Sequence, residues 1–121
     1  MMTGNTLALE KTDRLAIVER LMERYNAHDA DGYADMFAEH GSEAMYRGDV
    51  LREGREGVRE GLRAMFAEFP RNHAEVRAQY VVGNNVVLHE VVRRAPEVEP
   101  FEVVSIYSFS GGDIERVEFV R

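Results

Sequence analysis

The sequence has no cysteine in its 121 residues. This absence excludes disulfide bonds, a thiolate nucleophile and a cysteine-ligated metal, and it suits a reducing compartment, so we expect a cytoplasmic protein. Apolar runs are short, and none approaches the roughly 18 residues that a membrane-spanning helix needs. The opening stretch MMTGNTLALEKTD lacks the basic region and the long apolar segment of a secretory signal. We therefore expect no membrane partner.

Positive charge is scarce as well. The chain carries 15 Lys and Arg against 22 Asp and Glu, for a net charge of −7, which argues against a nucleic-acid partner. The four histidines, His28, His40, His73 and His89, do not have the spacing of a metal site. We expect neither a metal nor another cofactor.

The length of the chain suits one domain, with enough residues to bury a core. We interpret residues 1–12 as a loose lead-in and residues 13–121 as the domain. Helical periodicity appears from Asp13 to Tyr25, after the capping residue Asp29 as far as Gly41, and from about Arg55 to Phe69.

Two glycines, Gly57 and Gly61, lie inside the third predicted helix, where each costs about 1 kcal/mol relative to alanine. They indicate either the close approach of a neighbouring element or a poorly optimised helix.

Strand patterns dominate the second half. A short strand is predicted over Ser42–Arg47, and residues 48–54 read as a charged loop. After Pro70 the period changes to two, which predicts strands over 74–82, 86–94, 101–109 and 114–120. The expected dry face of the first of these consists of Ala74, Val76, Ala78, Tyr80 and Val82. Helices followed by strands predict an α+β fold with the helices on one face of the sheet.

Three segments resemble a known family. They are YNAHDADGYADMFAEHGSEAMY at 25–46, REGREGVREGLRAMF at 52–66, and VVGNN followed by VVLHEVV at 81–92. They are similar to the nuclear transport factor two-like superfamily, which includes SnoaL-like polyketide cyclases and ketosteroid isomerases. The resemblance extends from about Asp13 to Arg121. It implies a cystatin-like cone, in which three N-terminal helices, with one strand between the second and the third, pack on a strongly bent antiparallel sheet and enclose a mostly apolar pocket.

The catalytic residues of ketosteroid isomerases do not carry over. Those enzymes use an aspartate base, with a tyrosine and a protonated aspartic acid as donors. The resemblance puts these roles on Met45, Leu21 and Ser105. Methionine cannot accept the proton and leucine cannot donate one, so steroid isomerisation by that mechanism is not expected. The nearest substitutes are Tyr25 and Glu43.

The resemblance also implies which residues face the pocket. They are Leu21, Tyr25, Met45, Leu62, Met65, His89, Val91, Ser105, Tyr107, Val117 and Phe119. His89 is the candidate general acid or base because its side chain titrates near neutral pH; the alternative is a hydrogen-bonded core histidine. Glu43 is the fallback base; the alternative is a surface ion pair with Arg47.

Two functions compete. The first is an enzyme of isomerase, cyclase or hydratase type that performs acid–base chemistry on a small apolar substrate. The second is a non-catalytic dimeric module that binds a ligand or serves an accessory role. A homodimer through the outer sheet face fits both functions, because the resemblance implies it and that face is expected to be apolar. The residues expected there are Val86, Leu88, Val92, Val104 and Ile106.

Overall fold

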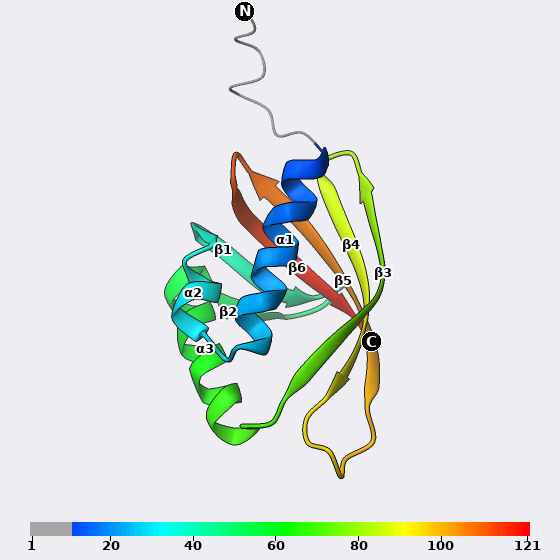
Figure 1. Ribbon diagram of the computed structural model, residues 1–121. Coiled ribbons are helices and arrows are strands. Elements are labelled where there is room, and N and C mark those ends of the chain that lie inside the picture. The colour runs from blue at the N-terminus through cyan, green and yellow to red at the C-terminus, as the bar shows by residue number, and fades with distance from the viewer. Residues whose placement is uncertain (1–10) are drawn as a thin grey trace, which may run out of the picture.

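The structure, a computed structural model, describes residues 11–121, so the lead-in expected over residues 1–12 lies almost entirely outside the described residues. Figure 1 shows three helices packed against one face of a sheet. The elements are α1 (Lys11–Asn26), α2 (Ala30–Ala34), β1 (Phe37–Met45), β2 (Val50–Glu53), α3 (Gly54–Glu68), β3 (His73–Val82), β4 (Asn85–Arg93), β5 (Phe101–Ser110) and β6 (Asp113–Val120).

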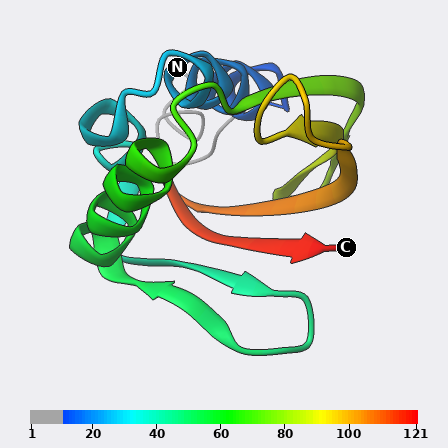
Figure 2. The same ribbon diagram turned by 90° about the horizontal axis from the view of Figure 1, so that it is seen from below.

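The sheet has the strand order β2-β1-β6-β5-β4-β3. It curls around the helices, as the view along the molecule in Figure 2 shows. The α+β, cystatin-like architecture is therefore confirmed. The sheet is mixed rather than wholly antiparallel, because β1 runs parallel to β6. That pairing brings an early strand and the last strand side by side within the sheet.

The second helix is shorter than the sequence suggests. Asp29 caps it as expected, since its side chain accepts a 2.9 Å hydrogen bond from the backbone N–H of Gly32. The helix ends at Ala34 because Phe37, which is fully buried, pairs with Ile114 of β6 instead of continuing the turn. Tertiary pairing thus overrides the local helical pattern, and the strand predicted over Ser42–Arg47 begins already at Phe37.

The predicted loop after β1 contains another strand. Arg47 adopts a positive φ of 55° in a tight turn, and β2 then pairs antiparallel with β1. Exposed Val50 and Leu51 occupy this edge strand. The expectation of a loop throughout residues 48–54 is therefore wrong.

A bulge changes which residues of β3 face the core. Its register with β4 shifts between Val76 and Ala78, and an extra residue in one strand turns the residues beyond it to the opposite face. Ala74 is buried as expected. Tyr80 and Val82 are not on a dry face: they are 61% and 64% exposed, on the outside of the sheet.

The inner and outer faces of strand β4 are exchanged relative to the prediction. Val86, Leu88 and Val92 are buried beneath the helices, so they do not belong to the outer face. Their alternating neighbours, Val87 and Val91, take the outer positions. The cause is that β4 is apolar on both faces, so periodicity cannot fix its register, and a shift of one residue exchanges the faces completely.

The helices and the inner sheet face share one hydrophobic core. Its fully buried members include Val18 and Leu21 of α1, Val58 of α3, Val86 of β4 and Val117 of β6. Among residues 11–121, no helix is long and apolar enough to cross a membrane.

Candidate functional site: a pocket with two carboxyl groups

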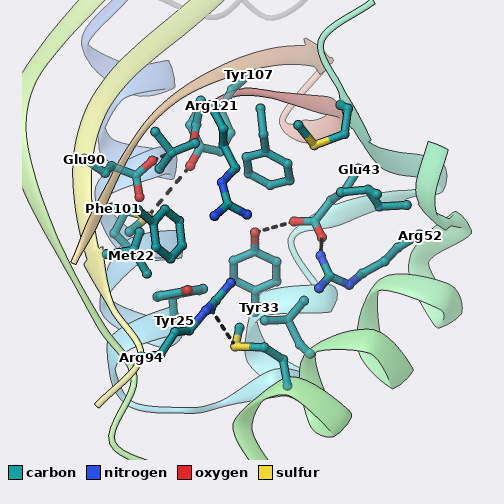
Figure 3. Close-up of a pocket in the computed structure, with 18 residues that line it drawn as sticks. Met22, Tyr25, Tyr33, Glu43, Arg52, Glu90, Arg94, Phe101, Tyr107 and Arg121 are labelled. Carbon is teal, nitrogen blue, oxygen red and sulfur yellow. Dashed lines mark hydrogen bonds and ion pairs between the residues drawn. The ribbon is translucent and has the colours of Figure 1, made fainter. Parts of the chain in front are cut away.

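A pocket of about 120 Å³ lies between the helices and the curled sheet. Figure 3 shows side chains from both layers converging on it. Half of the lining is apolar: Met22, Met45, Leu51, Leu62, Met65, Val92, Phe101, Val103 and Phe119. The other half can form hydrogen bonds: Tyr25, Tyr33, Glu43, Arg52, Glu90, Arg94, Ser105, Tyr107 and Arg121. Apolar walls with a few convergent polar groups are typical of small-molecule sites.

Glu43 of β1 is almost fully buried, and both of its oxygens are engaged. The Tyr33 hydroxyl donates to Oε2 at 2.5 Å, and Nη1 of Arg52 donates to Oε1 at 2.6 Å. Burial, followed by the neighbouring Glu43 carboxylate, raises the pKa of Tyr33 well above its usual value. Tyr33 therefore stays protonated and remains a donor, so the three side chains form one closed polar cluster on the wall of the pocket.

Gly61 allows Arg52 to reach Glu43. A Cβ at this position of α3 would lie 2.3 Å from Nε of Arg52 and 2.4 Å from its Cδ. The arginine thus lies flat across the helix surface where the glycine has no side chain. Of the two explanations for the helical glycines, close approach of a neighbouring element therefore holds at Gly61.

Glu90 is the second carboxyl group, and it projects from the inner face of β4 with 5% exposure. Ser105 of β5 donates to its Oε2 at 2.6 Å. Within residues 13–121, no side-chain cation forms an ion pair with it. Burial raises the pKa of Glu90 from 4.5 to about 7; the Ser105 hydrogen bond opposes the rise and the Glu43 carboxylate adds to it. A carboxyl group of this kind exchanges its proton near neutral pH.

Two tyrosines border the same space. Tyr107 is buried; its hydroxyl donates to the sulfur of Met22 at 3.7 Å and also lies beside the Ser105 hydroxyl. Burial, with the carboxylates of Glu90 and Glu43, raises the pKa of Tyr107 well above its usual value. Tyr25 accepts a 2.8 Å hydrogen bond from Nδ2 of Asn72, and burial raises its pKa too. Both hydroxyls keep their protons at neutral pH and can donate to a ligand.

The structure places His89 outside the pocket. It lies on the outer face of β4, where its side chain is 38% exposed and Nε2 lies 2.6 Å from Oε1 of Glu102. The expectation that His89 faces the cavity is wrong, because the inner face of β4 is the one that carries Leu88 and Glu90. Val91 is on the outer face for the same reason.

The other expected lining residues divide into two groups. Leu21 and Val117 are fully buried in the core and do not line the pocket. The structure does bring the remainder together around it: Tyr25, Glu43, Met45, Leu62, Met65, Ser105, Tyr107 and Phe119. Glu43 is not in a surface pair with Arg47, because Arg47 lies in the exposed turn and Arg52 takes that role.

Sequence reasoning missed Glu90, Tyr33 and the three arginines. One signal for Glu90 was available. The alternate set Val86, Leu88 and Val92 is slightly more apolar than the set that contains His89 and Arg93, which favours the core for the face that carries Glu90 without deciding it. The arginines had no such signal, because Arg52 was assigned to a loop and Arg94 and Arg121 lie at or beyond strand ends.

Among the described residues, no group of three or more His, Asp or Glu side chains is arranged to hold a metal ion. The polar side chains that line the pocket supply carboxyl, hydroxyl and guanidinium groups.

Comparisons with known proteins find structures of similar fold. An uncharacterized cystatin fold protein from Novosphingobium aromaticivorans is 43% identical, with a TM-score of 0.85, over 94% of this chain and 100% of the other. A putative polyketide cyclase from Sinorhizobium meliloti is 19% identical, with a TM-score of 0.75, over 93% and 100% of the two chains. SalBIII, an epoxide hydrolase/cyclase-like enzyme with a role in pyran ring formation in the polyether salinomycin, is 19% identical, with a TM-score of 0.78, over 91% of each chain. The last two likenesses concern the fold alone.

No curated protein matches the chain. The family model for the SnoaL-like domain, however, matches residues 18–117, which is most of the sequence and includes all of the strands but the last few residues of β6. This chain belongs to the SnoaL-like domain family.

Proposed function

We propose that this protein is a small enzyme that binds a largely apolar molecule in the pocket and transfers a proton on it, in a reaction of isomerase, cyclase or hydratase type. The single observation that supports this most is Glu90, a carboxyl group without a cationic partner in the described chain, whose pKa is raised to about 7 by burial. A group that is partly protonated at neutral pH can serve as either acid or base.

Each polar neighbour of Glu90 has a role in this proposal. Ser105 holds Oε2, which leaves Oε1 for the reacting atom. Tyr107 and Tyr25 offer hydroxyl donors to an oxygen that gains negative charge as the proton moves. Such a reaction does not use the ketosteroid isomerase residues, since Leu21 and Met45 occupy two of those positions.

Glu43 is the weaker candidate for the base. Both of its oxygens already accept short hydrogen bonds from Tyr33 and Arg52. Proton transfer to Glu43 would require one of these bonds to break inside a buried site, where an unpaired polar group is costly. We therefore assign Glu43 a positioning role.

We also propose a homodimer through the outer sheet face. Val104 and Ile106 of β5 lie there as expected, with Val87 of β4 beside them. Beyond the bulge in β3, Tyr80 and Val82 extend the apolar area and are more than half exposed. Exposed apolar area of this extent favours a partner, and a second copy of the chain presents the same surface.

The experiment is a proton-exchange screen in deuterated water. Small cyclic ketones, enones and epoxides are incubated with the protein, and deuterium incorporation or product formation is followed by NMR. We expect turnover of at least one compound class, and a loss of about 100-fold or more in Glu90→Gln. His89→Gln tests the sequence-based candidate, and Glu97→Gln, in an exposed loop, is the matched control for the loss of a carboxylate; both should retain turnover.

The outcomes separate the candidate functions. Turnover that survives Glu90→Gln but is abolished by His89→Gln would contradict the assignment of the proton-transferring group. Saturable binding in the pocket without turnover of any compound would favour the non-catalytic dimeric module instead.

A further inference from the structure

The pocket contains more positive charge than the acidic composition of the chain suggests. The net charge is −7, yet Arg52, Arg94 and Arg121 all line this one cavity. Arg52 is neutralised by Glu43. In the described part of the chain, neither Arg94 nor Arg121 forms an ion pair with an acidic side chain. The cavity therefore has two cationic groups that form no ion pair with a described side chain, and Glu90 is the nearest unpaired carboxyl group in the same lining.

Arg94 is held in one orientation by contacts with neutral groups, which do not neutralise its charge. Its Nη1 donates to Sδ of Met65 at 3.3 Å and to Oδ1 of Asn72 at 3.0 Å. Its Cζ lies over two aromatic rings, 5.2 Å from the centroid of Phe69 and 5.1 Å from that of Phe101. Both of these bonds come from Nη1, and the guanidinium also lies within hydrogen-bonding reach of the Tyr25 hydroxyl. A guanidinium carries five N–H donors, so at least two remain beyond these three contacts. A guanidinium fixed in this way is preorganised for a planar acceptor with two oxygens.

Asn72 links Arg94 to a second donor. This side chain is buried, with 2% exposure. Because a guanidinium can only donate, Oδ1 of Asn72 must face Arg94, and Nδ2 then donates to the Tyr25 hydroxyl at 2.8 Å. Within the described chain the hydroxyl hydrogen of Tyr25 has no acceptor of its own. One buried amide thus contacts both an arginine and a tyrosine donor; Figure 3 shows Arg94 and Tyr25 next to each other.

Arg121 approaches from the sheet side of the pocket. Its Cζ lies 3.9 Å from the centroid of the Phe101 ring, and Figure 3 shows its guanidinium directed into the cavity. Phe101 therefore contacts both arginines. Two cations that border one cavity, Arg94 partly buried and Arg121 exposed, favour an anionic ligand in it.

We propose that the ligand carries a carboxylate, which Arg94 binds through its remaining N–H donors with the Tyr25 hydroxyl as a further donor, while Arg121 adds positive charge. The apolar part of the ligand then extends along Met22, Val103 and Phe119 toward Glu90. A cavity of about 120 Å³ suits a body of about one ring, since an engineered cavity of about 150 Å³ holds benzene. This inference rests on the same pocket as the proposed function and specifies its substrate class as small cyclic carboxylates.

Binding of paired probes tests the proposal without any assay of activity. Benzoate and cyclohexanecarboxylate are each compared with their uncharged carboxamides, which have nearly the same shape, by NMR titration at pH 7.5. We expect each carboxylate to bind about tenfold more tightly than its amide, as a charge-assisted bidentate pair allows. Equal affinities, or no binding of the carboxylates at tens of millimolar, would overturn the inference on the unmodified protein.

Variants then assign the preference to a residue. Arg94→Gln should bring the ratio of carboxylate affinity to amide affinity close to one. Arg94→Lys keeps the charge but not the planar pair of N–H donors, so it should retain only part of the carboxylate preference. Arg77→Gln removes the same charge from an exposed position on β3 and should leave the ratio unchanged. If Arg94→Gln is folded by NMR and keeps the full ratio, the assignment is wrong.

Failure of this inference differs from failure of the proposed function. Turnover of neutral compounds that depends on Glu90, without a carboxylate preference, would leave the proposed function intact and remove the inference. A carboxylate preference that depends on Arg94, without turnover of any compound, would support the inference and contradict the proposed enzymatic function.

Discussion

Replacing Glu90 by glutamine should make the stability of the protein less sensitive to pH. Burial raises the pKa of this carboxyl group from 4.5 in an unfolded chain to about 7 in the folded one. Between these values the folded protein holds a proton that the unfolded chain releases. The contribution of Glu90 to stability is therefore fully present below pH 4.5 and is lost as the pH rises past 7.

The magnitude follows from the same two values. The difference between 4.5 and about 7 corresponds to about 3 kcal/mol of unfolding free energy, at about 1.4 kcal/mol per unit of pH. Glutamine has a similar size, can still accept the Ser105 hydrogen bond, and does not titrate. Relative to the wild type, Glu90→Gln should thus become more stable by about 3 kcal/mol between pH 4.5 and pH 8, with most of the change between pH 5 and 7.

Urea denaturation of both proteins across this pH range measures the difference directly. The other titratable groups that interact with Glu90 are Glu43 from β1, Tyr25 from α1, Tyr107 from β5 and His89 on the opposite face of β4; they are present in both proteins, so their own titrations largely cancel. Glu97→Gln, in an exposed loop, is the control, and its unfolding free energy should change with pH in the same way as that of the wild type. A stability difference between Glu90→Gln and wild type that does not change with pH would refute the reasoning.

Four further changes test the cluster around the pocket and the outer face. Arg52→Ala should lower the unfolding free energy by about 3–5 kcal/mol in urea, because it leaves Glu43 buried without its cation; a loss below about 1 kcal/mol would mean that water replaces the arginine. Tyr33→Phe should cost about 1–3 kcal/mol by the same assay, since one Glu43 oxygen loses its donor, and no loss would contradict the 2.5 Å hydrogen bond. Gly61→Ala should lower the melting temperature despite better helix propensity, because the new Cβ would displace Arg52; a higher melting temperature would show that Arg52 moves freely. Ile106→Glu should convert the proposed dimer to a monomer in size-exclusion chromatography with light scattering, whereas a monomeric wild type at micromolar concentration would remove the dimer proposal.

The order of the elements could be read from the sequence because hydrophobic periodicity reports which side of each element is buried. The switch of period after Pro70 separates α3 from the strands that follow, and the Gly83-Asn84-Asn85 turn marks the β3–β4 hairpin. These signals are local, and local signals suffice where only one face of an element is apolar.

The orientation of β4 could not be read in the same way. Both of its faces are rich in valine, so the two possible registers differ by only His89 and Arg93 on one face against Glu90 and Leu88 on the other. The register that the family resemblance implies puts the histidine on the inner face. The decisive factor is non-local: Ser105 on β5 supplies a donor for Glu90, and Glu102 on the outer face pairs with His89.

The bulge in β3 and the arginines illustrate the same limit. The sequence around Arg77 alternates regularly, and only its pairing with β4 reveals the extra residue. Arg52 reaches Glu43 because β2 folds back along β1 and Gly61 leaves room. None of these contacts joins residues that are close in sequence, so no periodic pattern contains them.

The two carboxyl groups in the pocket represent different solutions to the burial of a charge. Glu43 keeps a cation and two short hydrogen bonds, which is the arrangement expected of a structural acid. Glu90 has one hydroxyl donor and no ion pair within the described chain, so the folded state is destabilised by about 3 kcal/mol once it ionises. Glutamine or an apolar residue at this position would avoid that penalty, because Ser105 could bond to the amide or to water. A destabilising acid that faces a cavity supports the proposal that Glu90 transfers a proton there, since proteins keep costly buried groups chiefly where function requires them.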